Sequence, residues 1–149
     1  MTRRTDHALC TAAHHAAERI DAIGDHVAEV YAEIRAGRTS DPAYLVGAMR
    51  ASHAATVLAA NAAVEAVNEL ARRVAAAKRY RANLETPTNE ERQVAEYHAS
   101  AEGAAVAARV AVESIRALVE KAAAEYAPGG EDADPAHDEA TEAARRGVA

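Results

Sequence analysis

The chain has 149 residues, a formal net charge of −6, a single cysteine, and neither Phe nor Trp. This length predicts one domain, or one domain followed by a tail. The negative charge argues against a protein that coats nucleic acid, although a local basic patch can still bind phosphate. Because Cys10 is the only cysteine, an internal disulfide is excluded, and a reducing cytoplasm fits the chain.

More than a quarter of the residues are alanine, the residue with the highest intrinsic helix propensity. An alanine side chain buries little apolar area, so a bundle built from it has a thin core, and association is a common remedy. We expect no membrane span and no signal peptide, because charged and histidine residues interrupt every long apolar stretch. The Ala, Arg and Val bias resembles that of GC-rich bacterial genomes and their phages, which favours the cytoplasm, or a virion for a phage-encoded chain.

The first helix is expected over residues 6–36, with Thr5 as a candidate N-cap. Its apolar residues alternate in steps of four and three, which is the heptad spacing of a coiled-coil seam. They are Leu9, Ala13, Ala16, Ile20, Ile23, Val27, Val30 and Ile34. Gly37 then suits the position just past the end of a helix.

The second and third helices are expected over residues 42–84 and 89–126. Asp41 before Pro42 is a strong helix start, and Thr88 with Glu91 three residues later is typical of a capping box. Both segments continue the heptad pattern. The sequence therefore predicts an all-α fold, an antiparallel bundle of about three long Ala-rich helices in residues 1–128. An acidic, polar tail follows over residues 129–149, with a short helix at residues 135–146 that is exposed or loosely docked.

The predicted second helix is longer than the first, which predicts a protruding hairpin. Aligned from the Gly37 turn, the start of the first helix falls beside Ala71, so no third helix covers the hairpin beyond that level. An uncovered apolar stripe usually marks an interface. Its predicted interface residues are Val74, Tyr80, Leu84, Val94 and Tyr97.

The second-helix side of this tip is basic and is a candidate phosphate-binding site, with Tyr80 placed to stack on a base. The candidate residues are Arg72, Arg73, Lys78, Arg79 and Arg81. Two other interpretations compete with phosphate binding. Cations near a helix C-terminus offset its dipole, and these cations can pair with Glu90, Glu91 and Glu96 on the opposite helix.

Histidines form the remaining candidates. His7, Cys10 and His14 share one helix face, but His7 and His14 are two turns apart, so a zinc ion there would need ligands from another helix or chain. We therefore predict no metal. His26 and His53 are expected at a similar level of the bundle, where Thr56 can satisfy a polar group at the seam.

Arg92 and His98 have the Arg-x(4–6)-His spacing of the HEPN ribonucleases, which are also helical bundles, and this short pattern resembles their motif. Arg19 and His26 fit the spacing equally well. Gln93 stands after Arg92, at the position where the family usually has another polar residue. A HEPN-like ribonuclease is therefore one functional hypothesis, and it ranks below the two described in the next paragraph.

The leading hypothesis is a non-enzymatic, oligomeric scaffold or adaptor, or a component of a larger bacterial or phage assembly, that acts through helix–helix interfaces. Its partner is a second copy of the chain, another protein, or both, and we expect no cofactor. The alternative is a nucleic-acid-associated regulator that uses the basic tip. The sequence has no Gly-rich phosphate loop and no nucleophile elbow, which argues against an enzyme.

Overall fold

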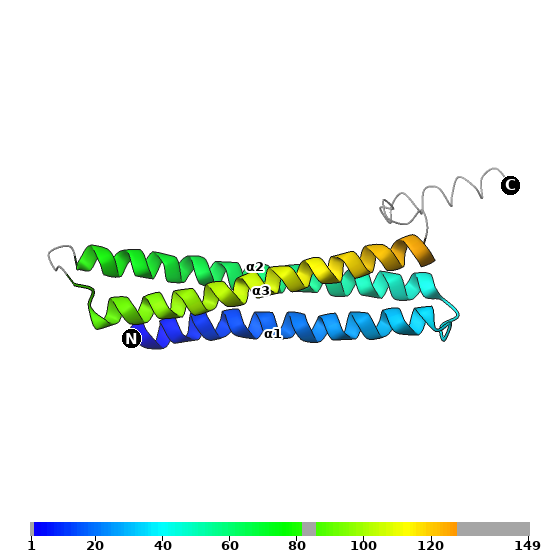
Figure 1. The fold of residues 1–149 in the computed structure, drawn as a ribbon, viewed down its shortest axis with the longest axis horizontal. Helices are drawn as coiled ribbons and strands as arrows, with labels where there is room; N and C mark the ends of the chain where they lie inside the picture. The colour runs from blue at the N-terminus through cyan, green and yellow to red at the C-terminus, as the bar shows by residue number, and fades with distance from the viewer. Residues whose placement is uncertain (1, 82–85, 128–149) are drawn as a thin grey trace, which may run out of the picture.

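The computed structural model describes residues 2–81 and 86–127. Within these ranges the chain forms three helices, α1 (Thr2–Arg35), α2 (Pro42–Tyr80) and α3 (Asn89–Tyr126), and every pair of them is in contact. Figure 1 shows the helices side by side along one rod, with α2 antiparallel to both α1 and α3. The predicted all-α bundle is confirmed. The predicted tail, residues 129–149, lies outside the described residues.

The turn between α1 and α2 is built on Gly37. Its φ is 70°, in the left-handed region that only glycine adopts without strain. The Gly37 amide donates to the Ile34 carbonyl at 3.1 Å, and the Arg38 amide donates to the Glu33 carbonyl at 3.2 Å. This pair of bonds is a Schellman motif, which satisfies carbonyls at the end of α1. The predicted role of Gly37 is confirmed.

The starts of α2 and α3 also follow the sequence signals. The Asp41 carboxylate accepts from the Tyr44 amide at 3.1 Å, with Pro42 in the first helical position. The Thr88 hydroxyl accepts from the Glu91 amide at 3.1 Å. The Glu91 carboxylate, however, pairs with Arg81 at the end of α2. The predicted capping residue therefore also ties α3 to α2 across the hairpin.

The core is uneven along the rod. At the end where α1 joins α2, the buried cluster contains large side chains, including Ile20, Val27, Tyr31 and Met49. Toward the other end, the cluster is mostly alanine. It consists of Cys10, Ala13, Ala63, Ala66, Leu70, Val94, Ala101, Ala104 and Ala105. Alanine brings helices close together but removes less apolar area from water, so this half has the smaller hydrophobic stabilisation.

Tyr31 links α1 to α3 at the large-residue end. Its hydroxyl donates to Glu125 Oε2 at 3.1 Å, and the cationic groups of Arg35 and Lys121 lie 5.7 and 5.9 Å from its ring centroid. Burial raises the pKa of Tyr31 above its ordinary value, and the hydrogen bond to Glu125 raises it further. The phenol is therefore held in its neutral, proton-donating form.

One ion pair shows the register of α1 against α2. Asp6, which is buried, accepts from Arg73 Nη1 at 3.1 Å. Counting from this pair along antiparallel helices places His26 level with His53, as the sequence predicts. The helix begins at Thr2, earlier than the expected residue 6, and Asp6 anchors it on α2 just after its first turn. At the other side, α2 ends at Tyr80 rather than residue 84, and the Arg81 amide bonds back to the Ala77 carbonyl at 3.1 Å.

The protruding hairpin is consequently shorter than predicted. The same register places Thr2 near the level of Ala77, so only the last turn of α2 extends past α1. Figure 1 shows the start of α1 close to the hairpin end of the rod. We expected α1 to start beside Ala71 and to leave a long two-helix projection uncovered. The projection is shorter than that, because α1 starts one turn earlier than expected and α2 ends one turn earlier.

Candidate interaction surfaces

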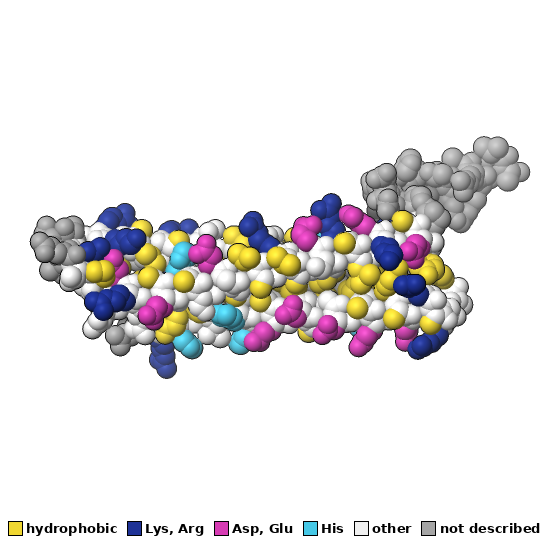
Figure 2. Space-filling model, viewed as in Figure 1, with side chains coloured by type: hydrophobic (Ala, Val, Ile, Leu, Met, Phe, Trp, Pro, Cys, Tyr) yellow, Lys and Arg dark blue, Asp and Glu magenta, His cyan; other side chains and the backbone are white. Residues whose placement is uncertain are grey.

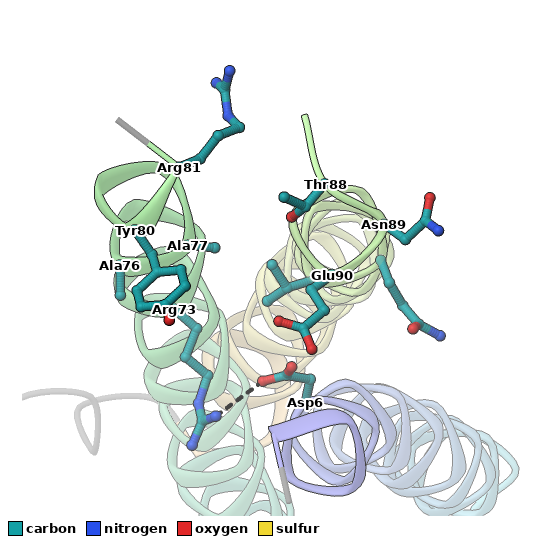
Figure 3. Close-up of a pocket in the computed structure, with 11 residues that line it drawn as sticks. Asp6, Arg73, Ala76, Ala77, Tyr80, Arg81, Thr88, Asn89 and Glu90 are labelled. Atoms are coloured by element: carbon teal, nitrogen blue, oxygen red, sulfur yellow. Dashed lines mark hydrogen bonds and ion pairs between the residues drawn. The ribbon is translucent and has the colours of Figure 1, made fainter. Parts of the chain in front are cut away.

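The short hairpin tip encloses a cleft of about 610 Å³ between α2 and α3. Figure 3 shows Asp6 at its base, bonded to Arg73, with Tyr80 on the α2 side and Glu90 pointing toward Asp6 from α3. We call this the tip cleft. Its lining residues are Asp6, Arg73, Ala76, Ala77, Tyr80, Arg81, Thr88, Asn89, Glu90, Gln93 and Val94. Acidic and basic groups are mixed in it, so its field does not select a polyanion.

Most of the predicted interface residues at the tip are packed inside the bundle. Val94 is buried in the Ala-rich cluster, and Val74 and Tyr97 are half-buried against it. The Tyr97 ring also meets the His7 ring edge-on, with centroids 5.8 Å apart. These three are therefore not an uncovered surface, because they pack with the cluster that Cys10 and Ala13 of α1 share with α2 and α3. Tyr80 is 97% exposed, and Leu84 lies outside the described residues.

Three of the five candidate phosphate-binding residues are already neutralised by acidic side chains. Arg72 Nη2 lies 2.7 Å from Glu69 Oε2, Arg73 pairs with Asp6, and Arg81 pairs with Glu91. The predicted pairing across the hairpin is thus confirmed for Glu91. Within the part of the chain that the structure describes, Lys78 and Arg79 make no ion pair. Figure 2 shows basic side chains at both ends of the rod, with acidic ones along α1.

The histidine face of α1 packs against α3. The His14 ring nitrogen Nε2 lies 2.8 Å from the Ser100 hydroxyl, His7 meets Tyr97, and Cys10 is buried in the core. Among residues 2–81 and 86–127, no group of three His, Cys, Asp or Glu side chains is placed to hold a metal ion. These side chains therefore act as packing and hydrogen-bonding groups between α1 and α3.

His26 and His53 share a level but not an environment. His26 is exposed and His53 is half-buried. The Thr56 hydroxyl donates to the His53 backbone carbonyl at 2.6 Å. Thr56 thus satisfies its own hydroxyl locally, as expected of a polar seam residue. The His53 Nε2 atom is buried and has no hydrogen-bond partner among the described residues.

Arg92 and His98 do not converge within one chain. The two residues are six positions apart on α3, so their side chains point in directions about 120° apart around the helix axis. Arg92 donates to the Pro87 carbonyl at 3.2 Å, away from the bundle. His98 Nδ1 lies 4.0 Å from Glu102. The spacing that resembles the HEPN motif therefore does not assemble a paired site here.

The most unusual surface lies on the outer face of α2 and was not predicted. Exposed residues step by four and three from Tyr44 to Leu58 and Ala62, so α2 carries a second heptad seam opposite its core seam. We call it the α2 outer stripe. It consists of Tyr44, Ala48, Ala51, Ala55, Leu58 and Ala62. Tyr44 is 72% and Leu58 is 71% exposed.

The α2 outer stripe is also free of charge. Between Asp41 and Glu65 the only charged residue of α2 is Arg50, which is half-buried at the side of the helix. A solvated helix face normally carries charged residues on every turn or two. This absence of charge was readable in the sequence. The core seam of the same helix accounts for its apolar residues, so periodicity alone does not indicate a second apolar face.

A smaller apolar patch on α3 provides a comparison. Val106 and Val110 are 56% and 64% exposed, and hydrophobic side chains gather over the middle of α3 in Figure 2. Exposed Glu102, Arg109 and Glu113 interrupt that patch. The α3 patch is therefore what an ordinary water-facing helix shows, whereas the α2 outer stripe is not.

Known proteins provide no guide to these surfaces. The chain matches no protein-family model, no curated protein and no solved structure. Within the described residues, no helix is both long and apolar enough to cross a membrane. The function must therefore be argued from the geometry of the bundle itself.

Proposed function

We propose that this protein is a non-enzymatic helical-bundle scaffold or adaptor that assembles through helix–helix interfaces, in the cytoplasm or, for a phage-encoded chain, in a virion. The observation that carries the proposal is the α2 outer stripe. It is a continuous uncharged face of heptad spacing on a helix whose opposite face already fills the core. Such a face is what a helix presents to a partner helix.

Exposure of the two large side chains of the stripe to water favours binding of a partner. Leaving Tyr44 and Leu58 in water forgoes the free energy that their burial would release, at about 25 cal/mol per Å² of apolar area. The alanines between them let a partner backbone approach closely. The helix is already folded within the bundle, so docking requires little ordering of the chain. Both features favour binding of a second helix along this face.

A concentration series by light scattering tests the proposal, with the wild-type chain and two matched variants. Leu58→Glu places a charge in the α2 outer stripe, and Val110→Glu makes a similar change in the exposed patch of α3. We expect the wild type and Val110→Glu to exceed the chain mass of 15.6 kDa and Leu58→Glu to remain at one chain. Both variants should keep full helicity, because both sites are exposed.

If the wild type stays at one chain, the partner is a different protein, and affinity capture with mass spectrometry is then the decisive measurement. A specific partner should be retained by the wild type and Val110→Glu and lost by Leu58→Glu. The proposed function is wrong if the chain neither self-associates nor retains any partner that depends on Leu58.

Nucleic-acid binding remains the second candidate, supported by Lys78 and Arg79 beside the exposed ring of Tyr80. The ion pairs of Arg72, Arg73 and Arg81 leave two of the five candidate cations for phosphates, and each phosphate contact contributes separately to affinity. We expect weak binding of labelled duplex or single-stranded DNA at physiological salt. Tight binding that is lost in the variant Lys78→Gln, Arg79→Gln would instead establish this second function.

A further inference from the structure

We propose that the occupant of the α2 outer stripe is the same stripe of a second copy, packed antiparallel about a two-fold axis. The inference rests on the proposed function and specifies its partner and geometry. Two observations lead to it: the order of large and small side chains along the stripe, and the absence of charge at its edges.

The stripe has defined ends. Asp41 precedes it and Glu65 follows it, at the next heptad positions in each direction. From Tyr44 to Ala62 it spans about 27 Å, or nearly three heptads. Between these ends, the stripe of a second copy matches it in length and in lack of charge. With the two-fold axis described next, Asp41 of one copy lies level with Glu65 of the other, so the acidic ends oppose the dimer and limit its affinity.

The order of the side chains selects the antiparallel arrangement. With the axis at the level of residue 53, Leu58 faces Ala48 of the second copy, and Tyr44 faces Ala62 of the second copy. Ala51 faces Ala55 at the centre. Each large side chain therefore meets a small one, which is how facing helix positions interdigitate. In a parallel, in-register pair, Tyr44 would meet Tyr44 and Leu58 would meet Leu58, while the alanines between them would leave gaps.

The flanking positions agree with close approach of two backbones. On one side of the stripe lie the exposed residues Gly47, Ala54 and Asn61, and on the other lie Leu45, Ser52 and Ala59. None of them is charged or long. A two-fold axis makes both halves of such an interface identical, so every contact is made twice. The stripe is less than three heptads long and mostly alanine, so it buries little apolar area, and we expect a weak, reversible dimer.

Disulfide trapping tests the arrangement directly. Two full-length variants, Ala48→Cys and Leu58→Cys, are made in a Cys10→Ala background so that no other thiol reacts. In the antiparallel dimer, residues 48 and 58 of different copies are neighbours. Residue 48 and its counterpart lie about 15 Å apart along the axis, beyond the roughly 7 Å that a disulfide spans between Cα atoms.

The mixture of the two variants should therefore form a covalent dimer under mild oxidation, whereas each variant alone should not. Efficient trapping of Leu58→Cys with itself would overturn the antiparallel geometry in favour of a parallel one. If the wild type associates but no pair is trapped, the α2 outer stripe is not the self-contact, although the proposed assembly stands. A wild type that stays monomeric throughout would exclude a second copy as the occupant, and capture of a Leu58-dependent partner would then still support the proposed function.

Discussion

Replacement of Leu70 by alanine tests how the thin half of the core is held. Leu70 is fully buried on α2, in a cluster whose other members are alanines, Cys10 and Val94. Removing its three outer carbons forfeits about 2.4 kcal/mol of transfer free energy, at about 0.8 kcal/mol per carbon. The cavity raises the cost to about 3–4 kcal/mol, because alanine neighbours have no flexible side chains with which to fill it.

The measurement is urea unfolding followed by far-UV circular dichroism, together with amide hydrogen exchange. Met49→Ala, in the large-residue cluster, is the matched control, with an expected loss of about 2–5 kcal/mol spread over the whole bundle. Leu70→Ala should instead raise exchange mainly in the first half of α1 and the last half of α2, where little other apolar area remains. A loss below about 1 kcal/mol, or exchange that rises equally along the rod, would refute the two-part description of the core.

Three further outcomes follow from particular contacts. Gly37→Ala should destabilise the fold by about 1 kcal/mol, because Gly37 has a positive φ. Gly103→Ala should stabilise α3 by about 0.5–1 kcal/mol, because the Cβ position of Gly103 lies in open space. Thermal unfolding should therefore show a lower melting temperature for the first variant and a higher one for the second. The raised pKa of Tyr31 means that the folded state holds the phenolic proton more tightly than the unfolded state does. The stabilisation of the fold that results is complete below the ordinary pKa of 10.0 and is lost as pH rises through the raised pKa. Unfolding measured across alkaline pH should show this decline in the wild type and a smaller one in Tyr31→Phe. Finally, added salt should strengthen self-association, because each copy carries a net charge of −6; weakening by salt would indicate ionic contacts instead, as in phosphate binding.

Local chemistry made the helices and their ends predictable from the sequence. The heptad seams, the Asp41–Pro42 start, the Thr88 cap and the Gly37 turn each act within a few residues of the chain, so their outcome does not depend on distant partners. The register of α1 on α2 was predictable for a similar reason, because a short turn fixes it. These signals were sufficient for the number, order and antiparallel arrangement of the helices.

The tip depended on contacts between residues far apart in the chain. Asp6 and Arg73 are 67 positions apart, and their bond ties the start of α1 to α2, next to the cluster in which Val94 is buried. No local signal indicates that an exposed-looking first turn is anchored in this way. Arg81 and Glu91, by contrast, flank the same hairpin turn. Their pairing was one of the interpretations that the sequence offered, and it makes a candidate phosphate ligand a structural link.

The outer face of α2 combined both kinds of information. Its heptad spacing and its lack of charge are properties of the sequence alone, and they follow from the identity of the residues between Asp41 and Glu65. Which of the two seams of α2 enters the core could be decided only by packing, since both have helical periodicity. The bundle buries the seam that continues along the helix from Val46 through Met49 to Leu70, because burying more apolar area releases more free energy. The seam of Tyr44, Leu58 and alanines is thereby left facing the solvent.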